Sequence, residues 1–91
     1  MIKFVLGEDK YIRLTVKSRK NESFIVSLST WELIMRDENI ESSGNCDVIV
    51  ENNTNHIRAK INPQQRGSYI LIITYHIADE ILKERIMLGV V

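Results

Sequence analysis

The segment GSYILIITY, residues 67–75, is the stretch of this chain that decides its fold. It is a long apolar run of mostly β-branched and aromatic residues, and a turn-forming segment, NPQQR at residues 62–66, precedes it. Residues of these types favour extended backbone, and a run that is apolar at almost every position suits a strand buried on both faces. We therefore expect the central strand of a β-sheet here, continuing to Ile77.

The segments around this run alternate apolar and polar residues with a period of two. That period indicates strands with one dry face and one wet face. The expected strands are residues 2–6, 11–17, 24–28, 46–51 and 57–61. The expected inward residues of the clearest ones are Ile12, Leu14 and Val16, then Cys46, Val48 and Val50, then Ile57, Ala59 and Ile61.

Two segments have both helical and extended patterns. Residues 30–36 contain good helix formers, but a helix here would have barely two turns and the alternation matches the neighbouring strands. Residues 78–86 have passable helical spacing, yet Ile86, Leu88 and Val90 resume the alternation. We interpret residues 30–36 as a strand, and residues 78–80 as a turn between two long antiparallel strands, with a helix over 78–86 as the alternative.

Polar segments separate these elements. Residues 18–23 are expected to form a surface loop, and residues 37–45 a second loop in which Gly44 signals a turn. Residues 52–55, NNTN, are expected to form a tight turn, because asparagine tolerates left-handed backbone.

Seven to eight short strands without crossover helices predict an all-β, antiparallel β-sandwich. Tyr69 lies at the start of the central strand, where immunoglobulin-like sandwiches place a tyrosine whose hydroxyl ties the preceding corner. Trp31 lies on the third long strand, where a core tryptophan is common. The predicted fold is therefore an immunoglobulin-like sandwich, held by packing without the disulfide of antibody domains.

Length and charge limit the functions open to the chain. Its 91 residues fit a single domain, residues 1–91, with 44% hydrophobic and 26% charged residues. Twelve basic residues balance twelve acidic ones, so no net field attracts a nucleic acid or an anionic membrane. The nearest basic cluster, Lys17, Arg19 and Lys20, is interpreted as a solvated turn. We expect neither a nucleic acid nor a membrane as a partner.

The single cysteine, Cys46, cannot form an intrachain disulfide and is expected to be a small core residue. The first seven residues lack the length and the cleavage signal of a secretory leader, and no apolar run is long enough to cross a bilayer. The expected site of synthesis is the cytoplasm.

No catalytic or metal-binding pattern emerges from the sequence. His56 and His76 accompany no nucleophile motif, and their spacing with Cys46 matches no metal-ligand pattern. The acidic residues Glu8, Asp9, Asp37, Glu38 and Glu41 lack the dense oxygen spacing of a calcium loop and are interpreted as hydrophilic surface. We expect no enzyme activity and no cofactor.

Several apolar residues fall on the nominally wet side of their strands. Single exposed apolar residues are ordinary, but several on neighbouring strands form a patch, which normally buries itself against another protein. The alternative is cover by another segment of the same chain. The expected partner interface consists of Ile34, Ile49, Ile70, Ile72, Met87 and Val91. The partner would be another protein subunit, or a second copy in a homo-oligomer.

The segment 67–75, followed by Ile77, Asp79, Glu80, Lys83, Ile86 and Val90, resembles the closing hairpin of small immunoglobulin-like proteins of bacteriophages and prophages. The opening, residues 6–9 leading into residues 12–16, is similar to the start of those proteins and of the N-terminal domains of some phage upper-baseplate proteins. The resemblance covers nearly the whole chain. It implies a virion or tail-associated structural part that binds other proteins, is made in the bacterial cytoplasm and catalyses nothing.

The residues and the resemblance together predict a structural, protein-binding module of a phage tail or baseplate. A carbohydrate-binding or adhesion module is the alternative. Such a module needs exposed aromatic side chains, and Tyr11 and Tyr75 are the candidates, because Trp31 is expected to be buried.

Overall fold

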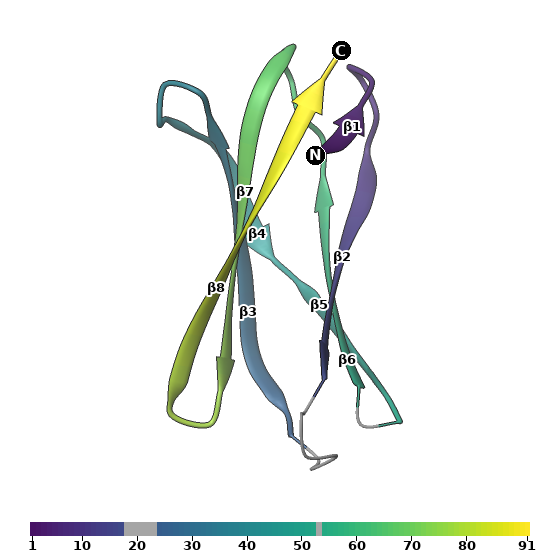
Figure 1. Ribbon diagram of the computed structural model, residues 1–91, viewed down its shortest axis with the longest axis vertical. Coiled ribbons are helices and arrows are strands. Elements are labelled where there is room, and N and C mark those ends of the chain that lie inside the picture. The colour runs from purple at the N-terminus through teal and green to yellow at the C-terminus, as the bar shows by residue number, and fades with distance from the viewer. Residues whose placement is uncertain (18–23, 53) are drawn as a thin grey trace.

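The computed structural model describes residues 1–17, 24–52 and 54–91. The predicted loop at residues 18–23, with Arg19 and Lys20, lies outside the described residues, as does Asn53 of the predicted turn. The described residues form eight strands, shown in Figure 1. They are β1 (Ile2–Phe4), β2 (Lys10–Lys17), β3 (Val26–Met35), β4 (Ile40–Asn45), β5 (Asp47–Glu51), β6 (Thr54–Ile61), β7 (Gly67–Ile77) and β8 (Glu80–Val90).

The strands form two sheets. The larger has the order β1-β8-β7-β3-β4 and the smaller the order β2-β6-β5. All pairings in these sheets are antiparallel, apart from β1, which runs parallel to β8. An immunoglobulin sandwich likewise divides its strands between a C′-C-F-G sheet and a B-E-D sheet, which correspond here to β4-β3-β7-β8 and β2-β6-β5. The predicted all-β, immunoglobulin-like sandwich is confirmed.

Strand β7 occupies the centre of the larger sheet, as the sequence predicts. It pairs with β3 along one edge and with β8 along the other, and both pairings cover most of its length. Its inward residues, Tyr69, Leu71, Ile73 and Tyr75, are all buried. In Figure 1, β7 lies between β3 and β8, and the C-terminus follows β8 at the end where β1 lies.

The chain reverses tightly between β7 and β8. Strand β7 ends at Ile77 and β8 begins at Glu80, with Ala78 in left-handed backbone at φ 51°. The predicted turn at residues 78–80 is confirmed, and the helical alternative for residues 78–86 is wrong. A helix there would leave the outer edge of β7 without the hydrogen-bonded partner that residues 80–90 supply.

Inward side chains of both sheets form one core. Its fully buried members come from five strands, which the alternation of each strand brings to the same layer. The largest of them are Phe4, Leu33, Ile57, Ile61, Leu71, Ile73 and Leu88. The predicted inward residues Ile57, Ala59 and Ile61 are confirmed, whereas Val50 is exposed.

Strand β4 contradicts the predicted loop at residues 37–45, since Ile40–Asn45 pair with β3. Gly44 is not at a turn but lies opposite Trp31, and a Cβ atom added to it would approach the indole Nε1 to 3.0 Å. The absence of a side chain lets the indole lie over β4, and Trp31 is buried as predicted. The predicted separate strands at 24–28 and 30–36 form one strand, β3, with an irregularity near Ser27.

The predicted turn at residues 52–55 is shorter in the structure. Asn52 has left-handed backbone, with φ 46°, but Thr54 and Asn55 belong to β6. Asn55 is fully buried and its Nδ2 donates a hydrogen bond to the carbonyl oxygen of Phe24, 3.2 Å away. That bond replaces part of the hydration that the amide loses on burial.

Truncating an inward side chain of β7 is expected to lower the free energy of unfolding more than truncating an outward one. We expect Leu71→Ala to lower the free energy of unfolding by about 3 kcal/mol, because it leaves a cavity in the core. The matched control is Ile72→Ala, whose half-buried side chain faces away from the core, and we expect a loss of about 1 kcal/mol. Urea unfolding measures both values. Equal losses would contradict the assigned inward and outward sides.

Candidate docking face

The outward face of the larger sheet carries an apolar row that crosses four strands. The strand register places Ile40 of β4 beside Ile34 of β3, Ile34 beside Ile70 of β7, and Ile70 beside Met87 of β8. Directly opposite residues in a sheet have Cβ atoms about 5 Å apart, so these four side chains form a continuous strip. We call these four residues the apolar row.

The apolar row is accessible from outside. Met87 is 54% exposed and Ile40 is 55% exposed, while Ile34 and Ile70 between them are half-buried. A hollow of about 450 Å³ lies over this part of the sheet, and Ile34, Ile70, Arg85 and Met87 help to line it. Apolar side chains around a hollow in a sheet face are typical of a surface that another molecule covers.

Three further rows of outward side chains lie beside the apolar row on the same face. Beside the apolar row, β7 contributes Ile72, with Glu32 on β3 to one side and Arg85 on β8 to the other. The next two rows are Thr30, Thr74 and Lys83, and then Leu28, His76 and Ile81. Leu28 is 52% exposed and Ile81 is 62% exposed, so a second apolar pair lies at the far end of the face.

The structure brings together four of the six predicted interface residues. Ile34, Ile70, Ile72 and Met87 share the outward face of the larger sheet. Ile49 does not, because β5 belongs to the smaller sheet, where Ile49 pairs with His56. The expectation that Ile49 shares this face is therefore wrong.

Val91, the sixth predicted residue, follows the end of β8. Its backbone accepts a hydrogen bond from Leu6 N and donates one to Phe4 O, both at 2.9 Å. It lies beside the segment after β1 and not in the apolar row.

Sequence reasoning missed Leu28, Ile40 and Ile81, which share this face. The sequence predicts a loop around Ile40, because the rest of its strand, ESSGN, is polar. Leu28 and Ile81 lie next to expected strand boundaries, where the alternation is ambiguous. Ile81 lies opposite His76 because the turn has two residues, whereas the predicted turn at residues 78–80 would have placed it opposite Ile77.

Tyr69 ties the corner before β7, as predicted. Its hydroxyl oxygen accepts a hydrogen bond from Gln65 N at 3.1 Å, and the hydroxyl donates to Glu41 Oε1 at 2.7 Å. Glu41 Oε2 also accepts from Gln64 N at 3.3 Å, which links β4 to the same corner. Burial, together with the bond to the Glu41 carboxylate, raises the pKa of Tyr69 to about 12.

The potential metal ligands do not come together. His56 on β6 faces outward from the smaller sheet, where its Nδ1 lies 3.2 Å from Thr15 Oγ1, whereas His76 is on the outward face of the larger sheet. No group of three metal-ligating side chains occurs within residues 1–17, 24–52 and 54–91. Cys46 lies between β4 and β5. Its partial burial raises the pKa of its thiol, which lowers its thiolate fraction.

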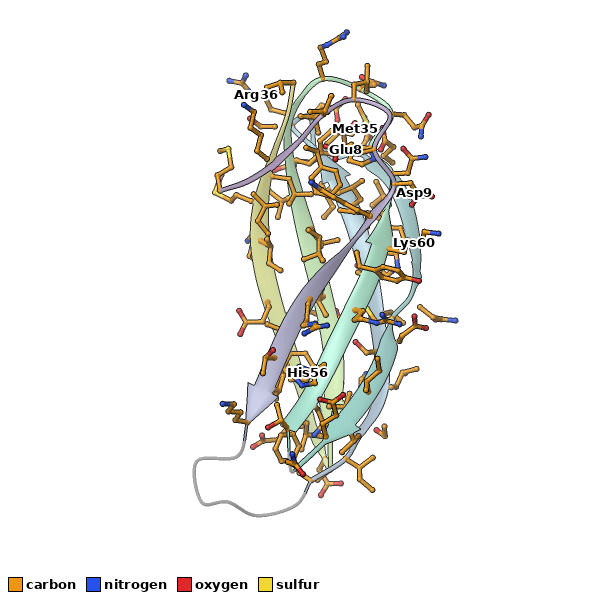
Figure 2. The ribbon with its side chains drawn as sticks, turned by 90° about the vertical axis from the view of Figure 1, so that its right-hand side faces the viewer. Glu8, Asp9, Met35, Arg36, His56 and Lys60 are labelled. Atoms are coloured by element: carbon orange, nitrogen blue, oxygen red, sulfur yellow. The ribbon has the colours of Figure 1, made fainter. Side chains whose placement is uncertain are left out.

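Two of the acidic residues, Glu8 and Asp9, form ion pairs with different lysines. Glu8 pairs with Lys10 at 3.5 Å, and a hydrogen bond from Val5 N lowers the pKa of Glu8. Asp9 pairs with Lys60 at 3.7 Å. Figure 2 shows Glu8, Asp9 and Lys60 toward one end of the sandwich, with Met35 and Arg36 at the same end and His56 toward the other.

The two aromatic side chains expected of a carbohydrate-binding module differ in their surroundings. Tyr75 is 7% exposed and belongs to the core, so its assignment as an exposed aromatic residue is wrong. Tyr11 is 47% exposed, but the Arg58 guanidinium lies 4.5 Å from the centre of its ring and Lys60 Nζ lies 5.8 Å away. The ring already interacts with two cations of the neighbouring strand.

No known protein family, curated protein or solved structure matches this chain. Among the described residues, no helix is long and apolar enough to span a membrane.

Removal of the Tyr69 hydroxyl tests its hydrogen bonds at the corner before β7. We expect Tyr69→Phe to lower the free energy of unfolding by about 2 kcal/mol, because the Glu41 carboxylate and the Gln65 amide both lose a partner. Tyr11→Phe, at an exposed ring, is the matched control and is expected to change stability by less than about 0.5 kcal/mol. Urea unfolding compares them, and a Tyr69→Phe variant as stable as the wild type would contradict the tie.

The raised pKa of Tyr69 predicts a loss of stability in alkali. Below pH 10, the ordinary pKa of tyrosine, the hydroxyl is protonated in both states and its contribution is fully present. As pH rises from 10 towards 12, the unfolded chain releases this proton first, and stability falls by up to ~3 kcal/mol. Unfolding at a series of pH values should show a smaller fall for Tyr69→Phe. Identical curves for the two proteins would refute the assignment.

Proposed function

We propose that this chain is a non-catalytic structural module that binds another protein subunit through the outward face of its larger sheet. The observation that carries the proposal is the apolar row, which crosses four strands and reaches Ile40 at an irregularity in the pairing of β3 with β4. Water contacts much of Ile40 and Met87, and covering them would remove apolar area from water at about 25 cal/mol per Å².

The shape of the face supports a protein as the bound molecule. The apolar lining of the hollow over the row is interrupted by Arg85, Arg36 and Glu38. Small-molecule sites are concave and enclose most of their ligand, whereas protein interfaces combine an apolar centre with a polar rim. A broad sheet face with charges around an apolar strip fits the second description.

The resemblance of segment 67–75 and of the opening residues to phage immunoglobulin-like proteins supports a more specific assignment. On that basis the module is a part of a phage or prophage tail or baseplate, made in the bacterial cytoplasm and carried into the virion. Its partners are then other tail subunits or copies of itself.

Site-specific photocrosslinking tests the docking face. A benzophenone amino acid replaces Met87 on the face or, as a matched control, Arg13, which is exposed on the outward side of the smaller sheet. The protein is produced in the organism that encodes it, irradiated, and its adducts are identified by mass spectrometry. We expect one defined protein adduct from position 87, and we expect that adduct to be absent when the benzophenone is at position 13. The proposal fails if position 87 gives no adduct, or if both positions give the same ones.

A further inference from the structure

We propose that the molecule covering this face is a second copy of the chain, bound face to face about a two-fold axis that runs along β7. This inference rests on the proposed docking function and specifies its partner. It follows from the strand register, which places unlike and complementary residues on the two sides of β7.

The geometry of face-to-face pairing dictates which residues meet. A two-fold axis that stacks one face on another must lie between the faces and parallel to them. When it runs along β7, each residue on β3 of one copy lies over the β8 residue from the same row of its partner copy. The β7 strands of the two copies then run in the same direction, and the sheets lie about 10 Å apart, a space that side chains fill.

The charged row is complementary in this arrangement. Glu32 of one copy lies over Arg85 of the other, and the two-fold axis generates the same pair twice. Within one copy, β7 lies between Glu32 and Arg85, so the two residues are two strand spacings, about 10 Å, apart. Face-to-face pairing brings each charge to an opposite charge beside the apolar row, which favours correct orientation.

The apolar rows are complementary by the same operation. Ile34 lies over Met87 of the second copy, while Ile70 and Ile72, on the axis, lie near their own counterparts. At the far end of the face, Leu28 lies over Ile81. The exposed apolar residues of β3 and β8 are therefore covered together.

An axis across the strands gives a poorer match. Placed on the charged row, it would bring Arg85 against Arg85 and Glu32 against Glu32, which is repulsive. Placed on the apolar row, it would leave Ile72 over Ser68 and Arg85 over Gly89. Of the other charged residues on or beside the face, Lys83 lies in the next row, over Thr30 of the second copy, while Lys3, Arg36 and Glu38 lie farther from the charged row. The axis along β7 is the one that pairs opposite charges at the centre.

The area of the face fits a weak, reversible dimer. The strands that lie over one another about this axis are β3, β7 and β8; about 4.8 Å apart, with about ten residues each at about 3.4 Å, they give ~490 Å² per copy. Two such faces total ~980 Å², in the range of weak, transient complexes below ~1,200 Å². We therefore expect a dimer that dissociates on dilution.

Charge reversal tests this arrangement and its symmetry. In Glu32→Arg alone, two arginines meet at each contact, and in Arg85→Glu alone, two glutamates meet. Each variant is expected to weaken its own dimer on the order of tenfold or more. A mixture of the two variants restores both ion pairs, so a heterodimer forms. Sedimentation velocity of the wild type, each variant and the equimolar mixture measures this, with Glu51→Arg and Arg13→Glu on the smaller sheet as charge-matched controls.

The inference predicts a dimeric wild type, weakened single variants, recovery on mixing and unaffected controls. The ¹H-¹⁵N spectrum of each variant verifies its fold, so failure to recover on mixing overturns the arrangement. A wild type that is monomeric up to millimolar concentration overturns the dimer itself. In that case a position-87 adduct with a different protein would still support the docking function, whereas the absence of any adduct would remove both.

Discussion

Hydrogen bonding along both edges of β7 is the constraint on which the rest of the structure depends. β3 and β8 satisfy its backbone on either side, so the strand cannot slip or turn without leaving buried polar groups unpaired. Because side chains alternate along a strand, this pairing also fixes which residues face the core. Leu71 and Ile73 become core residues, and Ile70 and Ile72 necessarily become surface residues of the same sheet.

The apolar character of both sides of β7 then has two consequences. The inward side joins the side chains of the smaller sheet in the core, where Leu71 meets the layer that contains Ile57. The outward side has no second sheet of the same chain against it among the described residues. An apolar outward side is unnecessary for folding, since the period of two would allow polar residues there. The proposed docking function rests on this apolar outward side.

The sequence was sufficient to predict the elements whose signal is local. The β7–β8 hairpin and the inward residues of β2 and β6 follow from alternation, and Tyr69 and Trp31 from their positions on the strands. Strand β4 was missed, because its stability comes from pairing with β3 and from the indole of Trp31 lying over Gly44. Both are long-range contacts, and no local pattern in residues 40–45, IESSGN, predicts them.

The candidate face was partly predictable for the same reason. Alternation identifies Ile34, Ile70 and Met87 as outward residues, but it does not specify which sheet a strand joins. Ile49 is outward on its own strand, yet β5 pairs with β6 in the smaller sheet. The register that aligns Glu32 with Ile72 and Arg85 is likewise a property of the assembled sheet.

Residue-resolved amide hydrogen exchange tests the central role of β7 most directly. The account predicts that the amides of Leu71 and Ile73 exchange only through global unfolding and are among the slowest in the chain, whereas edge strands β4 and β5 exchange faster through local opening. If the β7 amides exchanged as fast as those of β4 and β5, this strand would not be paired on both edges, and the account would be contradicted.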